Sequence, residues 1–154
     1  MGKGLVLENQ LQGVAGEYFV AAELSLRGVL AAITLRNSRG VDIVASSADG
    51  ARSVSIQVKT SSDAKPKWIL NKKAETFSSR NHFYVFVALT GLGNRPDYYV
   101  VPSPVVAEYV TSTHREWLAG KKADGSPRKD SAIRNFSDPT RAYREAWHLL
   151  GIFE

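Results

Sequence analysis

The sequence has no cysteine in its 154 residues, and this absence excludes a disulfide framework and any zinc site with cysteine ligands. No apolar run approaches the ~18 residues that a membrane-spanning helix requires. The polar string Glu8-Asn9-Gln10 begins too early for a signal-peptide core to precede it. We therefore expect a cytoplasmic protein with no membrane partner.

Common catalytic signatures are missing as well. The sequence has neither a P-loop nor a Gly-x-Ser-x-Gly string, and His82, His114 and His148 lack the spacing of metal ligands. It contains no internal repeat and no low-complexity tract. With 44% hydrophobic and 23% charged residues, residues 1–154 have the composition of a single folded domain.

Two short strings sixteen residues apart carry the strongest chemical signal. Asp42 is the single acid in an apolar run, and residues 54–59 (Val-Ser-Ile-Gln-Val-Lys) alternate strictly between apolar and polar. Because side chains along a strand have period two, Gln57 and Lys59 should share one face. The pattern predicts that an acid, an amide oxygen and an amine converge on adjacent strands.

These groups suit phosphodiester hydrolysis. The Asp49-Gly50 turn between the strings is a strong hairpin signal, so the two strands should pair. A divalent metal takes oxygen ligands, and attack on a phosphodiester needs positive charge near the developing negative charge. Asp42 and Lys59 would supply an oxygen ligand and a positive charge. The alternative is that these two residues form a cross-strand ion pair and that Gln57 is merely exposed.

Residues 9–26 have the apolar spacing of a helix, and the two glutamates on it differ in their surroundings. Glu23 lies four residues before Arg27, which predicts an exposed ion pair worth ~0.2–0.5 kcal/mol. Glu17 shares its stripe with small and apolar residues, where an acid costs stability unless it finds a partner or a ligand. We assign a functional role to Glu17 and a structural role to Glu23.

The helix acid, the strand aspartate and the Gln57-x-Lys59 string, in this order, resemble the PD-(D/E)XK nuclease superfamily, which has the restriction-endonuclease-like fold. By ordinary element lengths the likeness covers roughly the first ninety residues, and it is greatest for the Holliday-junction resolvase, Mrr and intron-endonuclease branches. It implies an α/β fold with a mixed central sheet flanked by helices. It also implies a metal-dependent endonuclease that hydrolyses DNA phosphodiester bonds with Mg²⁺ or Mn²⁺.

The resemblance gives each group a role. Asp42 would be the central metal ligand, and the Gln57 amide oxygen and the Val58 backbone carbonyl would complete the protein ligands. Glu17 would bind the metal through water or orient the attacking water, and Lys59 would stabilise charge on the phosphate. Gln57 departs from the commonest pattern, which has an acid there, and should weaken metal binding. It supports an alternative: a catalytically inactive nucleic-acid-binding or complex-assembly protein with a nuclease fold.

Positive charge is concentrated directly after this motif. The net charge is +5; residues 59–80 contribute +4, with six basic and two acidic residues, whereas residues 1–58 are neutral. A basic stretch beside a metal site suits a phosphate backbone, so DNA is the expected partner, with RNA as an alternative. A solvated lysine-rich surface is the competing interpretation. The expected nucleic-acid contacts are Lys65, Lys67, Lys72, Lys73, Lys121, Lys122, Arg128 and Lys129.

The remaining pattern predicts the order of elements; the sequence does not fix the oligomeric state, and a homodimer is expected only because cutting a duplex usually takes two active sites. A core is expected at residues 9–118, a basic loop at 119–138 and a final helix at 139–150. Trp68 is expected in the core or at a sheet edge; the alternative is that, lying between lysines, it stacks on a base. Strands are predicted at residues 30–35, 41–46, 54–60, 83–89 and 97–101, a connection at 36–40, a possible strand at 68–70, a helical turn at 72–77 and a helix at 103–118.

Overall fold

The computed structural model describes residues 8–35 and 39–153, so residues 36–38 of the expected connection lie outside the described part, as do residues 1–7. Within that part, the α-helices are α1 (Asn9–Leu26) and α2 (Ser103–Ala119), and the 3-10 helices are η1 (Lys72–Glu75) and η2 (Trp147–Leu150). The strands are β1 (Leu30–Ile33), β2 (Ile43–Ser46), β3 (Ser53–Ser61), β4 (Trp68–Asn71), β5 (His82–Ala88), β6 (Asp97–Pro102) and β7 (Ile133–Phe136). No described helix is long and apolar enough to cross a membrane.

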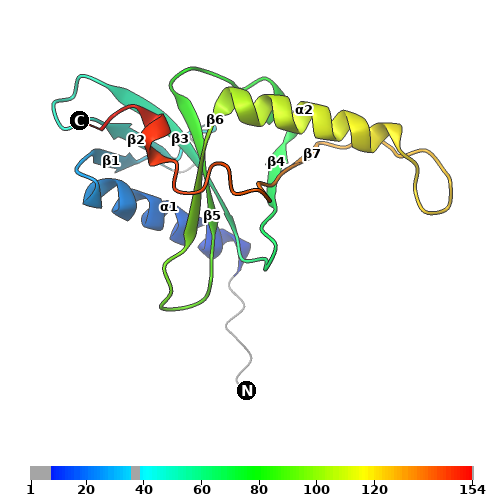
Figure 1. The fold of residues 1–154 in the computed structure, drawn as a ribbon, viewed down its shortest axis with the longest axis horizontal. Helices are drawn as coiled ribbons and strands as arrows, with labels where there is room; N and C mark the ends of the chain where they lie inside the picture. Colours follow the sequence, from blue (N-terminus) through cyan, green and yellow to red (C-terminus); the bar gives the residue numbers. More distant parts are fainter. Residues whose placement is uncertain (1–7, 36–38, 154) are drawn as a thin grey trace.

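Five of the strands form a mixed central sheet in the order β1-β2-β3-β5-β6. β3 and β5 run parallel, and the other neighbours are antiparallel. The predicted turn joins β2 to β3, with Gly50 at a φ of 73° that favours glycine. β4 and β7 form a separate two-stranded antiparallel ribbon. The predicted α/β fold, with a mixed sheet flanked by helices, is confirmed (Figure 1).

The alternation along β3 gives the sheet two packed faces. Val54, Ile56 and Val58 are buried on the face that α1 covers, which we call the α1 face. Tyr84 and Phe86 of β5 are buried on the opposite face, called here the α2 face, beneath α2 and the β4–β7 ribbon. Because both faces of the central strands are covered, β5 is buried along its whole length and reads in sequence as a continuous apolar run.

Helix α1 approaches β3 closely at one point. Gly16 is buried against Thr60, and a Cβ on Gly16 would overlap the Thr60 hydroxyl oxygen and lie 3.1 Å from its Cβ. Only glycine therefore allows this distance between helix and strand. Further along α1, Glu23 is confirmed as structural: it pairs with Arg27 (3.5 Å) and with Arg95 (3.0 Å).

The final helix predicted at residues 139–150 is wrong. Only η2 is helical there, and Arg141 and Glu145 have φ values of 57° and 55°, which an α-helix does not contain. The segment instead satisfies the outer edge of β6, an edge that would otherwise present unpaired main-chain groups. The bonds run from Val100 N–H to Tyr143 O (3.0 Å) and from Glu145 N–H to Tyr98 O (2.8 Å).

The basic loop predicted at residues 119–138 is wrong in its second half, which contains β7. The ribbon is fixed by Arg134, which is only 2% exposed and donates from Nε to Glu75 (2.7 Å). Trp68 of β4 is buried on the inner face of the ribbon and donates its indole N–H to Val87 O (3.0 Å), so its predicted place in the core is confirmed and the alternative, stacking on a base, is excluded. Residues 120–132 form an arm at the end of α2, which extends past the central sheet (Figure 1).

Candidate active site

Asp42 lies at the point where β2 leaves β3. The regular pairing of these strands ends at Ile43 and Ile56. Asp42 N–H donates to Ile56 O (2.8 Å), and Asp42 O accepts from Thr34 N–H (2.9 Å). The next donor on β3, Val58 N–H, is bound by Oδ2 of the Asp42 carboxylate (2.7 Å). The side chain thus takes the place of a main-chain acceptor, and this fixes the carboxylate against β3.

The Asp42 carboxylate is partly desolvated, and its surroundings compensate for this only in part. Burial raises the pKa of Asp42 above its ordinary value of 3.8, and the Val58 hydrogen bond and the charge of Lys59 oppose this only in part. Lys59 acts on Asp42 through its field and not through a direct ion pair, so the cross-strand pair of the alternative interpretation is not formed. A partly desolvated carboxylate of this kind is stabilised when a metal ion supplies the missing positive charge.

Gln57 and Lys59 share the α2 face of β3, as the alternation predicts. Both are half-buried, and the parallel register places them beside Tyr84 and Phe86 of β5. The N–H and C=O of one strand residue point to the same side, so the Val58 carbonyl faces the side that β2 has left. Three potential oxygen ligands therefore lie along the same short part of β3: the Gln57 amide and the Val58 carbonyl of the strand itself, and the Asp42 carboxylate bound to it.

Glu17 comes from the other side of the sheet. It follows Gly16, whose contact with Thr60 puts this part of α1 one residue along β3 from Lys59. Because α1 covers the α1 face while Lys59 lies on the α2 face, Glu17 and Lys59 come from opposite faces of β3. The structure locates the neighbouring Gly16 beside Thr60 of β3, and the role of Glu17 stays a prediction.

A polar pair beside this site was not predicted. Ser55 Oγ lies 2.8 Å from Nδ1 of His82, which is 2% exposed. Burial lowers the pKa of His82 to about 4, so the imidazole is neutral at pH ~7. The His82 ring also packs edge-on against Phe77, whose ring occupies the space that a Cβ on Gly40 would need, two residues before Asp42. The parallel register of β3 and β5 brings Ser55 and His82 together, and no local sequence pattern reveals that register.

The oxygen atoms at this site are the type of ligand that a hard divalent cation takes, but the site offers only a small number of them. Mg²⁺ keeps several waters and is held by one or two carboxylates, so the Asp42 oxygen that Val58 does not use, the Gln57 amide and the Val58 carbonyl are ligands of the correct type. In the described part of the chain, no three His, Cys, Asp or Glu side chains gather into a metal-binding cluster. One strand carboxylate with neutral partners predicts weaker binding than two carboxylates would give.

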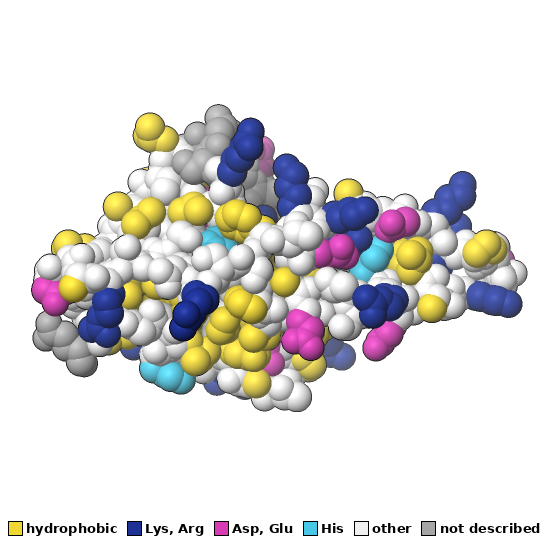
Figure 2. All heavy atoms as spheres, turned by 90° about the horizontal axis from the view of Figure 1, so that it is seen from above, with side chains coloured by type: hydrophobic (Ala, Val, Ile, Leu, Met, Phe, Trp, Pro, Cys, Tyr) yellow, Lys and Arg dark blue, Asp and Glu magenta, His cyan; other side chains and the backbone are white. Residues whose placement is uncertain are grey.

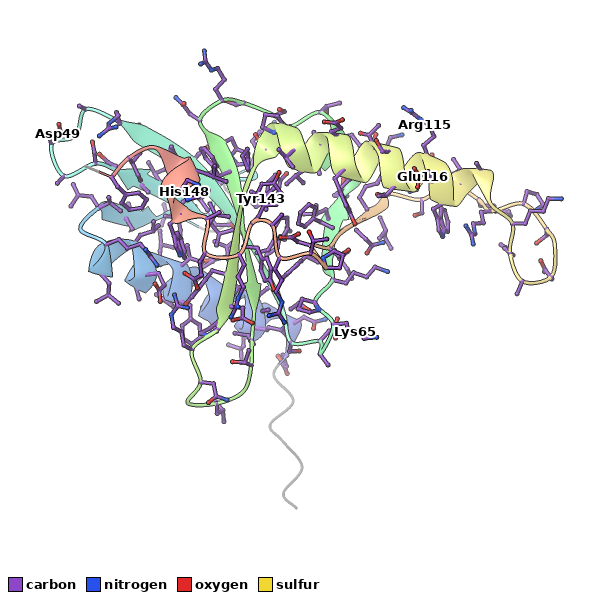
Figure 3. The ribbon with its side chains drawn as sticks, viewed as in Figure 1. Asp49, Lys65, Arg115, Glu116, Tyr143 and His148 are labelled. Carbon is purple, nitrogen blue, oxygen red and sulfur yellow. The ribbon has the colours of Figure 1, made fainter. Side chains whose placement is uncertain are left out.

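The predicted nucleic-acid contacts form two groups. One group brackets β4, and all its members are exposed: Lys65 (labelled in Figure 3), Lys67, Lys72 and Lys73. The other group lies on the arm, where Figure 2 shows dark-blue side chains at the far end of the molecule: Lys121, Lys122, Arg128 and Lys129. Arg128 differs from the rest because its guanidinium lies over the Trp117 ring (5.1 Å) and donates to Trp117 O (2.6 Å).

Two solved structures match nearly the whole chain. The bacterial homing endonuclease I-Ssp6803I superposes with a TM-score of 0.57 and 20% identity, over 95% of this chain and 94% of the other. The Holliday junction resolvase Hjc of the archaeal hyperthermophile Archaeoglobus fulgidus superposes with a TM-score of 0.54 and 15% identity, over 92% and 98%. The protein has the restriction-endonuclease-like fold. The fold of the PD-(D/E)XK nucleases that the sequence predicted is therefore confirmed, whereas no family model and no curated protein matches the sequence.

Proposed function

We propose that the protein is a divalent-metal-dependent endonuclease that hydrolyses phosphodiester bonds in DNA. One observation carries the proposal: the Asp42 carboxylate is held against β3 where the strands part, directly beside Gln57-Val58-Lys59. The nuclease fold of the two structural neighbours supports the same conclusion.

Each residue has a task in this proposal. Asp42, Gln57 and the Val58 carbonyl would hold Mg²⁺ or Mn²⁺, which when bound supplies positive charge at the scissile phosphate and lowers the pKa of water. Lys59 places a second positive charge beside the phosphate and stabilises the charge that develops on its oxygens, an effect typically worth ~3–4 kcal/mol. Glu17 orients the attacking water.

DNA is the proposed partner, and the lysines that bracket β4 are its proposed phosphate contacts. A duplex has two strands to cut, so we also propose that two copies of the chain act together. Steering by the basic stretch would raise the rate of encounter with DNA and would weaken steeply with salt.

A second candidate function has one observation in its favour. Gln57 is neutral where an acid would add a metal ligand, and the described residues hold no cluster of three acidic or histidine ligands. A protein that binds nucleic acid or assembles a complex without turnover would tolerate such a site. Gln57→Glu separates the two functions: if Gln57 is a ligand, the variant should gain more melting temperature than the wild type on adding Mg²⁺ or Mn²⁺.

Cleavage of plasmid, single-stranded and branched DNA with and without metal tests the proposal. Asp42→Asn and Lys59→Ala should each abolish cleavage and leave DNA affinity and the fold nearly unchanged. Asp124→Asn is the matched control, since Asp124 is an exposed acid at the tip of the arm. A folded Asp42→Asn variant with wild-type cleavage would refute the assigned site, and a wild type with no cleavage on any substrate would favour the second candidate.

A further inference from the structure

The β4–β7 ribbon has an outer face that α2 borders only on the β7 side. Its inner side chains are buried, whereas the side chains between them alternate outward. Ile69 is 65% exposed and Ile133 is 54% exposed, and the register places Ile69 opposite Asn135. These two large apolar side chains on one face of a short ribbon give a partner a small apolar surface to contact.

Asn135 adds hydrogen-bonding capacity to this face. Its side chain makes no hydrogen bond within the described residues, so both the amide donor and the carbonyl acceptor are available. The other outward asparagine, Asn71, is already used, because its Oδ1 accepts from Lys73 N–H (3.1 Å) at the start of η1. The two asparagines thus have different roles, one structural and one open to a ligand.

A groove runs along the ribbon beside α2. Tyr109, Thr113 and Trp117 lie at four-residue spacing on the helix and face Ile133 and Asn135 across a hollow of about 400 Å³. Trp117 is 43% exposed, so an aromatic face borders the groove. The groove therefore has polar and apolar side chains on both of its sides.

The charge around the ribbon identifies the occupant. Four exposed lysines bracket β4 in sequence, two before it and two after it. Glu75, the acid that follows them in sequence, is engaged by the buried Arg134, which also holds β7 in place through Ser131 O (2.7 Å). The lysines around the ribbon therefore keep their positive charge for an anionic partner, and the Glu75–Arg134 pair keeps the ribbon rigid.

The inference rests on the proposed action on DNA and goes further. We infer that the outer face of the β4–β7 ribbon enters the major groove of duplex DNA and reads base sequence there. The major groove, about 12 Å wide, admits a two-stranded ribbon, whereas the minor groove, about 6 Å wide, does not. Asn135 has the amide geometry that pairs with the adenine edge, and Ile69 and Ile133 present apolar surface to thymine methyl groups. The bracketing lysines hold the flanking phosphates and carry no sequence information.

The chain links this reading surface to the cleavage site. From Asn71 the backbone passes through η1 to Phe77, whose ring occupies the space that a Cβ on Gly40 would need, two residues before Asp42. Six residues of chain span at most ~20 Å, so the ribbon lies close enough to the site for one duplex to reach both. Bases read by the ribbon would therefore lie a few base pairs from the bond that is cut.

Selection from a duplex library with a randomised segment tests the inference. Wild-type protein and Asn135→Ala are incubated with the library without added metal, and the bound DNA is sequenced. We expect the wild type to enrich adenine at a defined position and Asn135→Ala to lose that preference about tenfold. Its affinity for random duplex and its salt dependence should not change, because phosphate contacts remain. Asn81→Ala is the matched control, an exposed asparagine next to β5, and should keep the preference.

Three results would overturn the inference: an adenine preference that Asn135→Ala retains, a wild type with no preference, or tighter binding of single-stranded DNA or RNA than of duplex. Ile133→Ala gives an independent check, since it should lose thymine discrimination and keep the adenine preference. Cleavage of a selected duplex with Mg²⁺ is measured separately. A sequence preference that depends on Asn135 in a protein that never cuts would refute the nuclease proposal and support the reading surface.

Discussion

Replacing Gly16 by alanine should destabilise the protein although alanine favours helices. The gain in helix propensity is ~1 kcal/mol. Against it, the new Cβ overlaps the Thr60 hydroxyl and lies 3.1 Å and 3.3 Å from Cβ and Cγ2 of Thr60, closer than the 3.4–4 Å of ordinary contact. Overpacking a buried contact costs ~1–3 kcal/mol, and three simultaneous close contacts place this case near ~3 kcal/mol. We expect a net loss of ~2 kcal/mol.

Gly13→Ala is the matched control, because a Cβ at Gly13 meets nothing within 4 Å on the same helix. It should gain ~1 kcal/mol, so the two alanine variants should differ by ~3 kcal/mol in urea unfolding. In a domain of this size, ~1 kcal/mol shifts the melting temperature by ~2–4 °C, so the two variants should shift in opposite directions. Thr60→Ala should relieve most of the Gly16→Ala penalty in a double-mutant cycle. Equal stability of the two alanine variants would refute the close approach of α1 to β3.

Three further measurements probe the site and the ribbon. Burial raises the pKa of Asp42, so the folded state of the metal-free protein holds this proton more tightly than the unfolded state does. The stability of the wild type relative to Asp42→Asn should therefore fall as the pH rises from 3.8 through the raised pKa. Thermal melts of both proteins at constant ionic strength measure this difference. A difference that does not change with pH would contradict the prediction. Charge reversal of the four lysines that bracket β4 should lower the log–log salt slope of duplex binding by ~0.9 for each phosphate that is no longer neutralised, and an unchanged slope would move the contacts to the arm. Glu75→Ala should lower the free energy of unfolding by ~3 kcal/mol, because the buried Arg134 guanidinium then keeps Asp130, at 3.9 Å, as its one acidic neighbour among the described residues. A loss below ~1 kcal/mol would mean that backbone carbonyls alone are sufficient to stabilise the guanidinium.

Local patterns were sufficient for the elements whose side chains are sorted by period. The strict alternation that ends in Lys59 predicted β3 and its two faces, and the turn at Gly50 predicted its pairing with β2. The same patterns located Asp42 and Lys59 on neighbouring segments. Periodicity could not show that β2 would begin one residue after Asp42, or that the carboxylate would replace a main-chain acceptor for Val58.

The wrong predictions share one physical cause, which is pairing between residues distant in sequence. Residues 139–150 have helical composition, yet the open edge of β6 supplies hydrogen bonds that a helix there would forgo. β7 is polar and short, and it is a strand because β4 lies beside it and Arg134 reaches Glu75. The parallel register that brings His82 to Ser55 is likewise fixed by the whole sheet. Context of this kind is absent from any window of neighbouring residues.

The segment that closes the outer edge of β6 also protects the folded protein from other copies of itself. Residues 141–146 occupy main-chain groups of β6 that would otherwise be a template for strands from another molecule. The two left-handed residues there, Arg141 and Glu145, prevent the segment from becoming a regular strand that could pass the pairing outward. Proteolysis or mutation that frees this segment should therefore first cause intermolecular sheets to form, before any change at the site where β2 and β3 part.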